Sequence, residues 1–474
     1  MPLTVIDQLK SELTLVISIN NTCHMVRMRT WRTVSICFLG LFSSFSMAGN
    51  TPSTETNKQV QAVVEPLPAH VTAIKLPWVL EQTLLNNVAL KAYPYSLRAS
   101  EALTLQAGIK PNPELSVNVE NILGTGDMQG IDNAEISLAL SQLIELGDKR
   151  QRRIDYASAN QKQQLSEYEA QRLQVLAETT ERYLQLLRLQ AIDQWIARRI
   201  GVEQTALQNI EQRAQAGAIL QADVSKMQLR LSRSKVLQQR IAGEFTVAKQ
   251  KLAAMWSSEV AFTAVNDELK AVQVLPTAAS VLNAIETAPQ YLQLLNVERV
   301  LVAKRRMEES KAQADITLGV GLKSVDGFDD GAFMVNFSMP LQFSNPNAGN
   351  ILAAKALEDK ANEEQRLVRE QLKLTLLAVH QSMVNNAQQV ELLNTQVLPL
   401  AKQLLTHTQT AYQTGQANVL QLADAQAELF SVELELIEAK AAVYLSLLAL
   451  ERITGQSMTV ANTHFTPVVA MDNQ

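Results

Sequence analysis

One stretch of the chain limits its fold more than any other. Between Lys149 and Ala216 it contains a single glycine, Gly201, and no proline, and alanine, leucine, glutamine and arginine fill most positions. These residues favour helix. A helix over 147–216 would be about 100 Å long, whereas the mean helix of a globular protein has about 11–12 residues. The stretch therefore predicts a rod-shaped helical structure and not an ordinary globular domain.

The sequence pattern at the end of this helix occurs twice in the chain. Gly217 stops it, and a second helical stretch follows from about Leu220 to Trp256. A shift of 198 positions places Gly217 on Gly415, which separates a helix ending at Thr414 from another that continues to about 453. Two long helices joined by a glycine predict an antiparallel coiled-coil hairpin, so we expect two hairpins with tips at these glycines.

Each expected hairpin also has a residue that disfavours helix at the same distance from its tip. The shift that aligns the tips places Gly201 on Pro399, and both lie 16 residues before their tip glycine. Glycine and proline both weaken a helix interior. We therefore predict helix break points at Gly201 and Pro399, where the hairpins bend.

Two shorter regions change from helical to strand periodicity. Residues 113–143 and 314–343 each contain two segments that alternate apolar and polar residues around a glycine-rich turn, which predicts two β-hairpins. Tilted strands of about ten residues are long enough to cross a bilayer. The apolar side chains expected to face lipid are Leu115, Val117, Val119, Ile136, Leu138, Leu140, Ile316, Leu318, Val320, Phe333, Val335 and Phe337.

Four strands cannot close a barrel in a membrane by themselves. An open sheet edge leaves backbone groups unsatisfied in lipid, and small membrane barrels have about eight strands. Two chains would supply eight strands and three would supply twelve. The expected fold class is therefore mainly α with a small β part: long coiled-coil hairpins plus four membrane β-strands per chain, in two structural repeats, assembled as an α/β-barrel tube. A soluble sandwich edge is the alternative for the strands, but it leaves the long helices unexplained.

The first 48 residues have the pattern of a secretory signal peptide. "MRTWR" (28–32) is basic, "TVSICFLGLFSSF" (33–45) is apolar, and "SMA" (46–48) predicts cleavage after Ala48. Residues 1–24 fit no part of this pattern, so Met25 or Met28 is the expected start. Both cysteines, Cys23 and Cys37, precede the cleavage site. The exported chain would therefore have no thiol, and no cysteine for lipidation.

The remaining chain divides into repeats and connectors. We expect an extended leader over 49–76, a first repeat over 77–256, a connector over 257–277, a second repeat over 278–456 and a tail over 457–474. In each repeat a helix precedes the β-hairpin, and the helical hairpin follows it.

Several function classes have no support in the residues. The formal net charge is −5, which gives no basic surface for nucleic acid. We find no phosphate loop, nucleophile elbow or HExxH motif, so we expect no enzyme and no cofactor. The histidines that follow the signal peptide are scattered and no cysteine accompanies them, so we predict no metal site.

Four passages resemble one family in particular. The chain resembles the TolC-like outer membrane efflux channels over nearly all of 77–456, and within them the CzcC/CusC-like heavy-metal branch. That branch usually has proline at the position of Leu143. The passages are "AGIKPNPELSVNVEN" (107–121), "LSQLIELGDKRQRRI" (140–154), "MPLQFSNPNAGNI" (339–351) and "LPLAKQLLTHTQTAYQTGQANVLQLADAQAEL" (398–429).

The resemblance implies a homotrimer with a twelve-stranded barrel in the outer membrane and a helical tunnel in the periplasm. It implies that the tips dock on a periplasmic membrane-fusion adaptor of an inner membrane pump of the resistance-nodulation-division (RND) class. The docking candidates are Ala216, Gly217, Ala218, Thr414, Gly415 and Gln416.

The resemblance also implies a gate at the periplasmic mouth. In the family, aspartates lie six and nine positions after the second tip glycine, which here are Gln421 and Asp424; the six-position residue of the first copy is Asp223. Three copies of Asp424 would form a ring that attracts cations. Asp223 could instead simply favour the start of its helix.

Three functions remain open at this point. The first is an exit duct for heavy-metal cations in a tripartite efflux system. The second is an exit channel for drugs or for type I protein secretion. The third is a periplasmic coiled-coil scaffold without a pore.

Overall fold

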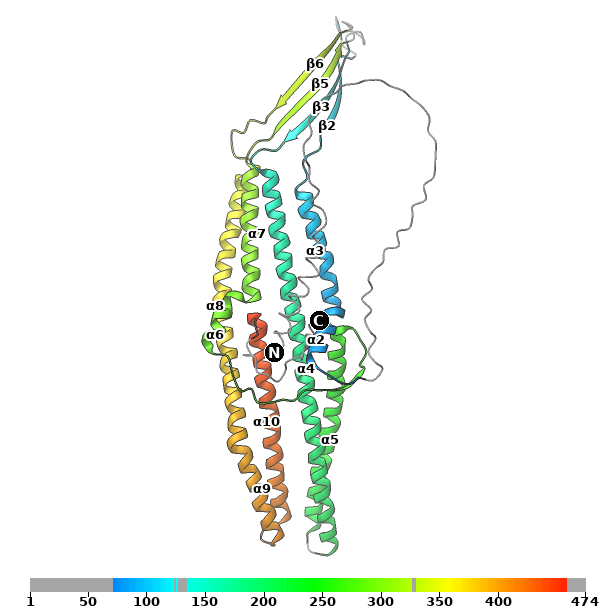
Figure 1. Ribbon diagram of the computed structural model, residues 1–474, viewed down its shortest axis with the longest axis vertical. Coiled ribbons are helices and arrows are strands. Elements are labelled where there is room, and N and C mark those ends of the chain that lie inside the picture. Colours follow the sequence, from blue (N-terminus) through cyan, green and yellow to red (C-terminus); the bar gives the residue numbers. More distant parts are fainter. Residues whose placement is uncertain (1–70, 123–124, 127–133, 218, 326–329, 458–474) are drawn as a thin grey trace, which may run out of the picture.

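The computed structural model describes residues 71–122, 125–126, 134–217, 219–325 and 330–457. The expected signal peptide, most of the leader, the tail from 458 and the tip residue Ala218 lie outside these residues. Within them, long helices run along one axis, with a sheet at one end and two helical tips at the other (Figure 1). Among the described helices, none combines the length and the apolar character that crossing a membrane requires.

The sheet joins the two β-hairpins. Its strands are β2 (Glu114–Glu120), β3 (Glu135–Ile144), β5 (Ile316–Val325) and β6 (Asp330–Ser338), in the order β2-β3-β5-β6. Every neighbouring pair is antiparallel. Since β3 pairs with β5, the sheet links the two repeats and leaves β2 and β6 as its edges.

The helical hairpins have the lengths that the sequence predicts. In the first, α4 (Lys149–Gln215) has 67 residues and is followed by α5 (Gln221–Ala253) and the short η2 (Ala254–Trp256). In the second, α8 (Ala348–Leu392) continues through a π-turn, η5 (Leu393–Val397), into α9 (Leu398–Gln413). After the tip, α10 (Val419–Thr454) returns.

The helices that precede the sheet are more divided than expected. The sequence predicts one helix before each β-hairpin, but the first repeat has α2 (Leu76–Asn86) and α3 (Val88–Ala107). Asn87 separates them because its side chain accepts hydrogen bonds from the amides of Ala89 and Leu90 and caps α3. In the second repeat, α6 (Ala278–Asn283), η3 (Ala284–Thr287) and α7 (Pro289–Lys311) replace one helix.

A two-stranded parallel sheet lies where the sequence predicts only extended leader and connector. In it β1 (Val71–Ile74) pairs with β4 (Phe262–Val265). Helix α4 holds it: the Gln190 side chain donates to the Val265 carbonyl and accepts from the Val265 amide, both at 2.9 Å. The Tyr183 hydroxyl donates to Asp267, and burial raises the pKa of that carboxyl. The structure therefore adds two short strands within the predicted leader and connector.

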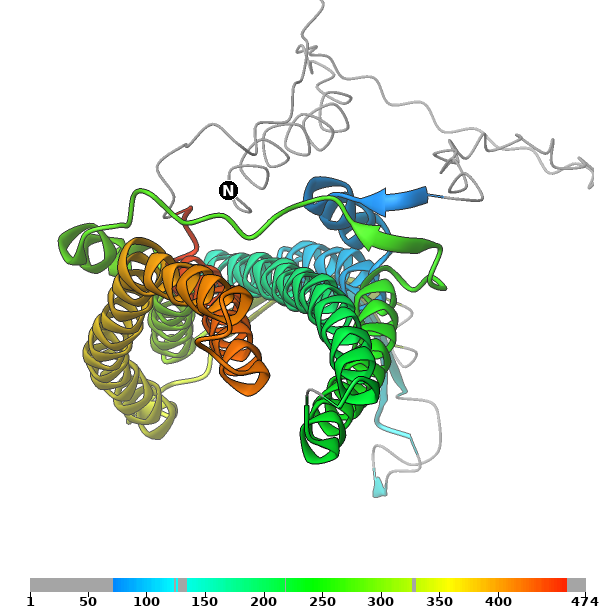
Figure 2. The ribbon, with the colours of Figure 1, turned by 90° about the horizontal axis from the view of Figure 1, so that it is seen from below.

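Seen along its axis, the helical part is a curved plate. The β1–β4 pair and its flanking segments lie on the convex side, with α8 toward one end of the arch and α5 toward the other (Figure 2). Apolar clusters hold the hairpins together: Trp195 and Ile196 of α4 share one with Leu231 and Ile241 of α5 and Phe430 of α10. The plate has two lateral ends, and each is formed by a helix of one hairpin.

Candidate membrane face, tips and gate

The sheet register collects the predicted lipid-facing residues on one face. Val117 lies opposite Leu138, Leu138 opposite Leu322, and Leu322 opposite Phe333. Directly opposite residues of an antiparallel sheet point to the same side, so these form continuous apolar rows. Eleven of the twelve predicted side chains are exposed; Ile316 is half-buried opposite Ile144.

The other face of the sheet carries small and polar residues. Ser116, Ala139, Gly321 and Met334 form one row across it. A Cβ on Gly321 would lie 2.6 Å from the Leu138 carbonyl oxygen and 2.9 Å from the Ala139 Cβ. Ala139 and Ser137 are only 5% and 8% exposed although no second layer of described residues covers this face. The face is therefore concave, and its neighbouring strands already cover it.

Both tips depend on glycine in the left-handed region. The φ of Gly217 is 71° and that of Gly415 is 77°, which side chains with a Cβ rarely adopt. Each amide bonds back to its helix, Gly217 to the Ala214 carbonyl at 2.9 Å and Gly415 to the Tyr412 carbonyl at 3.2 Å. The described docking candidates are all exposed: Ala216, Gly217, Thr414, Gly415 and Gln416.

The two tips differ in how the next helix begins. Asn418 and Gln421 form a reciprocal capping box: the Gln421 amide donates to Asn418 Oδ1 at 2.9 Å, and the Asn418 amide donates to Gln421 Oε1 at 2.8 Å. The counterpart of Asn418 is Leu220, which makes no capping bond and is 73% exposed. The second tip is therefore polar and self-capped, whereas the first presents an apolar side chain.

The predicted gate residues have separate surroundings. Asp424 forms an ion pair with Arg230 of α5, and its side chain is 61% exposed. Gln421 is engaged in the capping box. Asp223 lies in the first turn of α5, half-buried, where an acidic residue favours the helix start. Of the three, only Asp424 reaches from one hairpin to the other.

The sequence reasoning missed Arg230 and the seam to which it belongs. Along the seam, first-hairpin arginines meet second-hairpin carboxylates: Arg188 binds Glu438 at 2.6 Å, and Arg198 binds Glu433 at 3.3 Å. Near the tips, the Arg213 guanidinium lies 4.6 Å from the Tyr412 ring centre. No residue spacing could have revealed these pairs, because they depend on how the hairpins pack.

The two predicted break points behave differently. Helix α4 passes through Gly201 without interruption, so the predicted break there is wrong. Glycine keeps its amide donor and weakens a helix by only about 1 kcal/mol, which packing on α5 and α10 offsets. Pro399 lacks that donor, and the helix widens into the π-turn Leu393–Val397 immediately before it. The second hairpin alone is irregular at this height.

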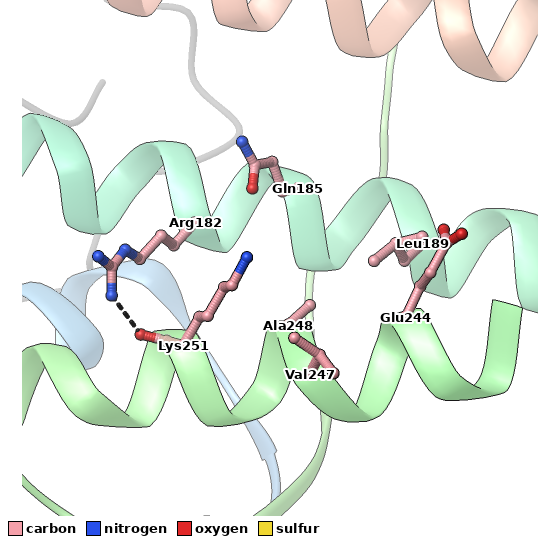
Figure 3. A pocket seen from close by; sticks show the side chains of 7 residues that line it. All are labelled: Arg182, Gln185, Leu189, Glu244, Val247, Ala248 and Lys251. Atoms are coloured by element: carbon pink, nitrogen blue, oxygen red, sulfur yellow. Dashed lines mark hydrogen bonds between the residues drawn. The ribbon is translucent and has the colours of Figure 1, made fainter. Parts of the chain in front are cut away.

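A shallow cavity of about 300 Å³ lies between α4 and α5. Figure 3 shows Arg182, Gln185 and Leu189 on α4 above Glu244, Val247, Ala248 and Lys251 on α5. Arg182 donates to the Lys251 carbonyl at 2.6 Å. The cavity mixes apolar walls with both charges and contains no catalytic arrangement. Within the described residues, no three His, Cys, Asp or Glu side chains gather closely enough for a metal ion.

Comparison with known proteins identifies the family. The model of the outer membrane efflux protein family matches residues 79–258 and 300–456, which cover most of both expected repeats. The chain therefore belongs to the outer membrane efflux protein family, whose TolC-like architecture the sequence resembles.

Individual relatives point to the branch. The chain is 24% identical over 376 residues to the cobalt-zinc-cadmium resistance protein CzcC of Cupriavidus metallidurans. The aligned region covers 78% of this chain and 87% of CzcC. Its fold is similar to the outer-membrane channel OprN, with TM-score 0.67 and 17% identity over 80% of this chain and 89% of OprN. CusC gives TM-score 0.62 and 14% identity over 80% of this chain and 91% of CusC. The similarity to CzcC agrees with the expected heavy-metal branch, and the two solved channels show the fold.

Proposed function

We propose that the chain is the exit duct of a tripartite RND-type efflux system and carries heavy-metal cations from the periplasm to the outside. Three copies would form one channel in the outer membrane of a Gram-negative bacterium, exported by the signal peptide and not lipidated. The observation that carries this proposal is the joining of an open four-stranded sheet, apolar on one exposed face, to a plate of helices about 100 Å long.

The parts take the roles that this architecture gives them. The apolar rows of the sheet would contact lipid, and its small polar face would line the pore. The tips at Gly217 and Gly415 would dock on a membrane-fusion adaptor, which connects the duct to the pump. The chain itself would perform no chemistry, and the pump would supply the energy.

The similarity to CzcC favours metal cations over drugs or secreted proteins. Deletion of the gene should lower tolerance to divalent heavy metals such as cobalt, zinc and cadmium, and expression of the chain should restore it. Unchanged metal tolerance with lowered drug tolerance would support the drug-efflux alternative. A protein that stays in the soluble periplasmic fraction would favour the scaffold and contradict the channel.

The gate can be tested by a matched pair of variants. Asp424→Ala and Arg230→Ala each remove one partner of the ion pair between the hairpins, so both should raise single-channel conductance in planar bilayers. Their selectivities should differ in sign: loss of Asp424 lowers cation preference, and loss of Arg230 raises it because three carboxylates become unpaired. If neither conductance nor selectivity changes, the pair does not line the mouth.

A further inference from the structure

All charged side chains of the four large-sheet strands lie on one face of the sheet. The apolar face has no charged residue in β2, β3, β5 or β6. The register places every charge on the opposite face, among its small and polar residues: Glu114, Glu120, Glu135, Lys323 and Asp330. Charged groups are costly to remove from water. This face is therefore the one that suits a wet pore.

Most of these charges gather at the end of the sheet that lies farthest from the helices (Figure 1). One row across the sheet runs from Glu120 through Glu135 and Val325 to Asp330. Lys323 lies in the adjacent row, opposite Ser137. This end of the pore face thus carries three carboxylates and one ammonium per chain.

Glu120 and Glu135 have the arrangement of a partial ligand set for a divalent cation. They lie directly opposite each other on β2 and β3, and Cβ atoms of such pairs are about 4.5–5.5 Å apart. Two carboxylates at this spacing repel each other, and a cation between them would relieve the repulsion. Carboxylate oxygens are also ligands for zinc. Glu120 is exposed, so an entering cation could reach it.

Lys323 already binds one member of this pair. Its ammonium reaches from β5 to β3 and forms an ion pair with Glu135, and the two side chains are 28% and 21% exposed. Lys323 is the only base in the four strands. None of the ion pairs among the described residues includes Glu120. One of the two opposed carboxylates is therefore neutralised, and the other faces the solvent alone.

We propose that Lys323 prevents the pore from retaining its metal cargo. It is a built-in counterion for Glu135, so Glu120 and Glu135 do not hold a divalent cation together. The inference rests on the proposed function and deepens it by naming a residue that sets how the duct treats divalent cations. Conduction requires that a pore attract an ion and still release it. Lys323 leaves the attraction of the open carboxylates and removes the chelating pair.

Zinc block of a potassium current tests this role. Purified channels in planar bilayers carry the current while zinc chloride is titrated. Lys323→Gln frees Glu135 and should lower the zinc concentration for half-block about tenfold. Adding Glu120→Gln to this variant removes one ligand and should restore the weak block of the unmodified channel. Lys323→Arg keeps the charge and should resemble the unmodified channel.

A matched control removes an ion-paired lysine outside the strands. Lys355 of α8 lies 2.9 Å from Asp359, and Lys355→Gln should leave zinc block unchanged. The yield of assembled channel is measured for each variant, because Lys323 could simply offset the repulsion between the two glutamates. A lower yield of Lys323→Gln with unchanged zinc block in the channels that form would show that purely stabilising role and overturn the proposal.

The other outcomes separate this inference from the function on which it rests. Potassium current with the same zinc block in Lys323→Gln and in the unmodified channel would overturn the role of Lys323 and leave the channel intact. Strong block that persists after Glu120→Gln would place the zinc elsewhere and also overturn it. Absence of current from the unmodified protein in the bilayer would contradict the proposed channel itself.

Discussion

The two helical hairpins share a sequence register but not a structure. In the first, α4 is one uninterrupted helix of 67 residues, and the tip leads into α5 without a side-chain cap. In the second, a π-turn and Pro399 interrupt the descending helix, and a capping box starts α10. The first hairpin thus has a regular helix and an uncapped tip. The second hairpin has an interrupted helix and a capped tip.

This difference shows where duplicated hairpins have diverged. A π-turn contains wider, less regular hydrogen bonding and commonly marks functional sites, so bending should concentrate in the second hairpin. Leu220 stands where a capping side chain would usually stabilise the helix by about 0.5–2 kcal/mol. Its exposed apolar side chain suits a contact with a partner. We therefore expect the second hairpin to move and the first tip to anchor.

The largest expected effect comes from the core of the first hairpin. Trp195 is 1% exposed, and its indole donates to the Phe430 carbonyl at 3.0 Å. Trp195→Ala should cost about 3–5 kcal/mol by cavity formation, and Leu393→Ala, at the equivalent position of the π-turn, should cost less, near 2 kcal/mol, because a π-turn can relax into the space. Thermal unfolding in detergent measures both. Equal losses would mean that the hairpins are equally rigid.

The strands should show no such asymmetry. Leu138 of the first repeat and Val335 of the second lie on the same apolar face. Arginine at either should impair assembly by about 2–4 kcal/mol per site if the sheet lies at the bilayer midplane. Asn118→Arg and Asn336→Arg, on the other face, are the controls and should assemble. Equal outer membrane yields for all four variants would show that the faces are assigned wrongly.

The caps can be exchanged between the tips. Asn418→Ala should destabilise the start of α10 by about 1 kcal/mol, whereas Leu220→Asn should stabilise the start of α5 by a similar amount. Hydrogen exchange of the first-turn amides measures each effect. If Leu220 anchors an adaptor, Leu220→Asn should also weaken adaptor binding although the hairpin is more stable. Unchanged binding would remove the anchoring role.

The smallest expected effect concerns the break points. A Cβ at Gly201 would meet nothing within 4 Å, so Gly201→Ala should stabilise α4 by about 1 kcal/mol and leave conductance unchanged. Pro399→Ala restores an amide donor beside the π-turn and should alter conductance by stiffening the second hairpin. A conductance change at Gly201 and none at Pro399 would reverse the assignment of the moving hairpin.

Local patterns predicted much of this structure. Alternation identified all four strands of the large sheet and their faces, and the two glycines located both tips, because these features depend on neighbours within a few residues. The Gly201 break was wrong because intrinsic propensity is small beside the packing of a long helix on two others.

Contacts between distant segments could not be read in the same way. Strands β1 and β4 pair across about 190 residues of intervening chain, and each is only four residues long. No nearby residue in the sequence set Arg230 apart. Its ion pair with Asp424 appears only when the two hairpins are packed together.

The unequal faces of the sheet have a mechanical consequence. Leucine, valine and phenylalanine occupy one side, and glycine, alanine and serine the other, so the two surfaces differ in volume and the sheet must bend toward the smaller side. Strand number and shear set the radius of a closed sheet, and small residues on the inner side allow the strands to approach, above all at Gly321, where even a methyl group would push β3 and β5 apart. Enlarging that single residue would flatten the arc and widen any cylinder that such sheets share.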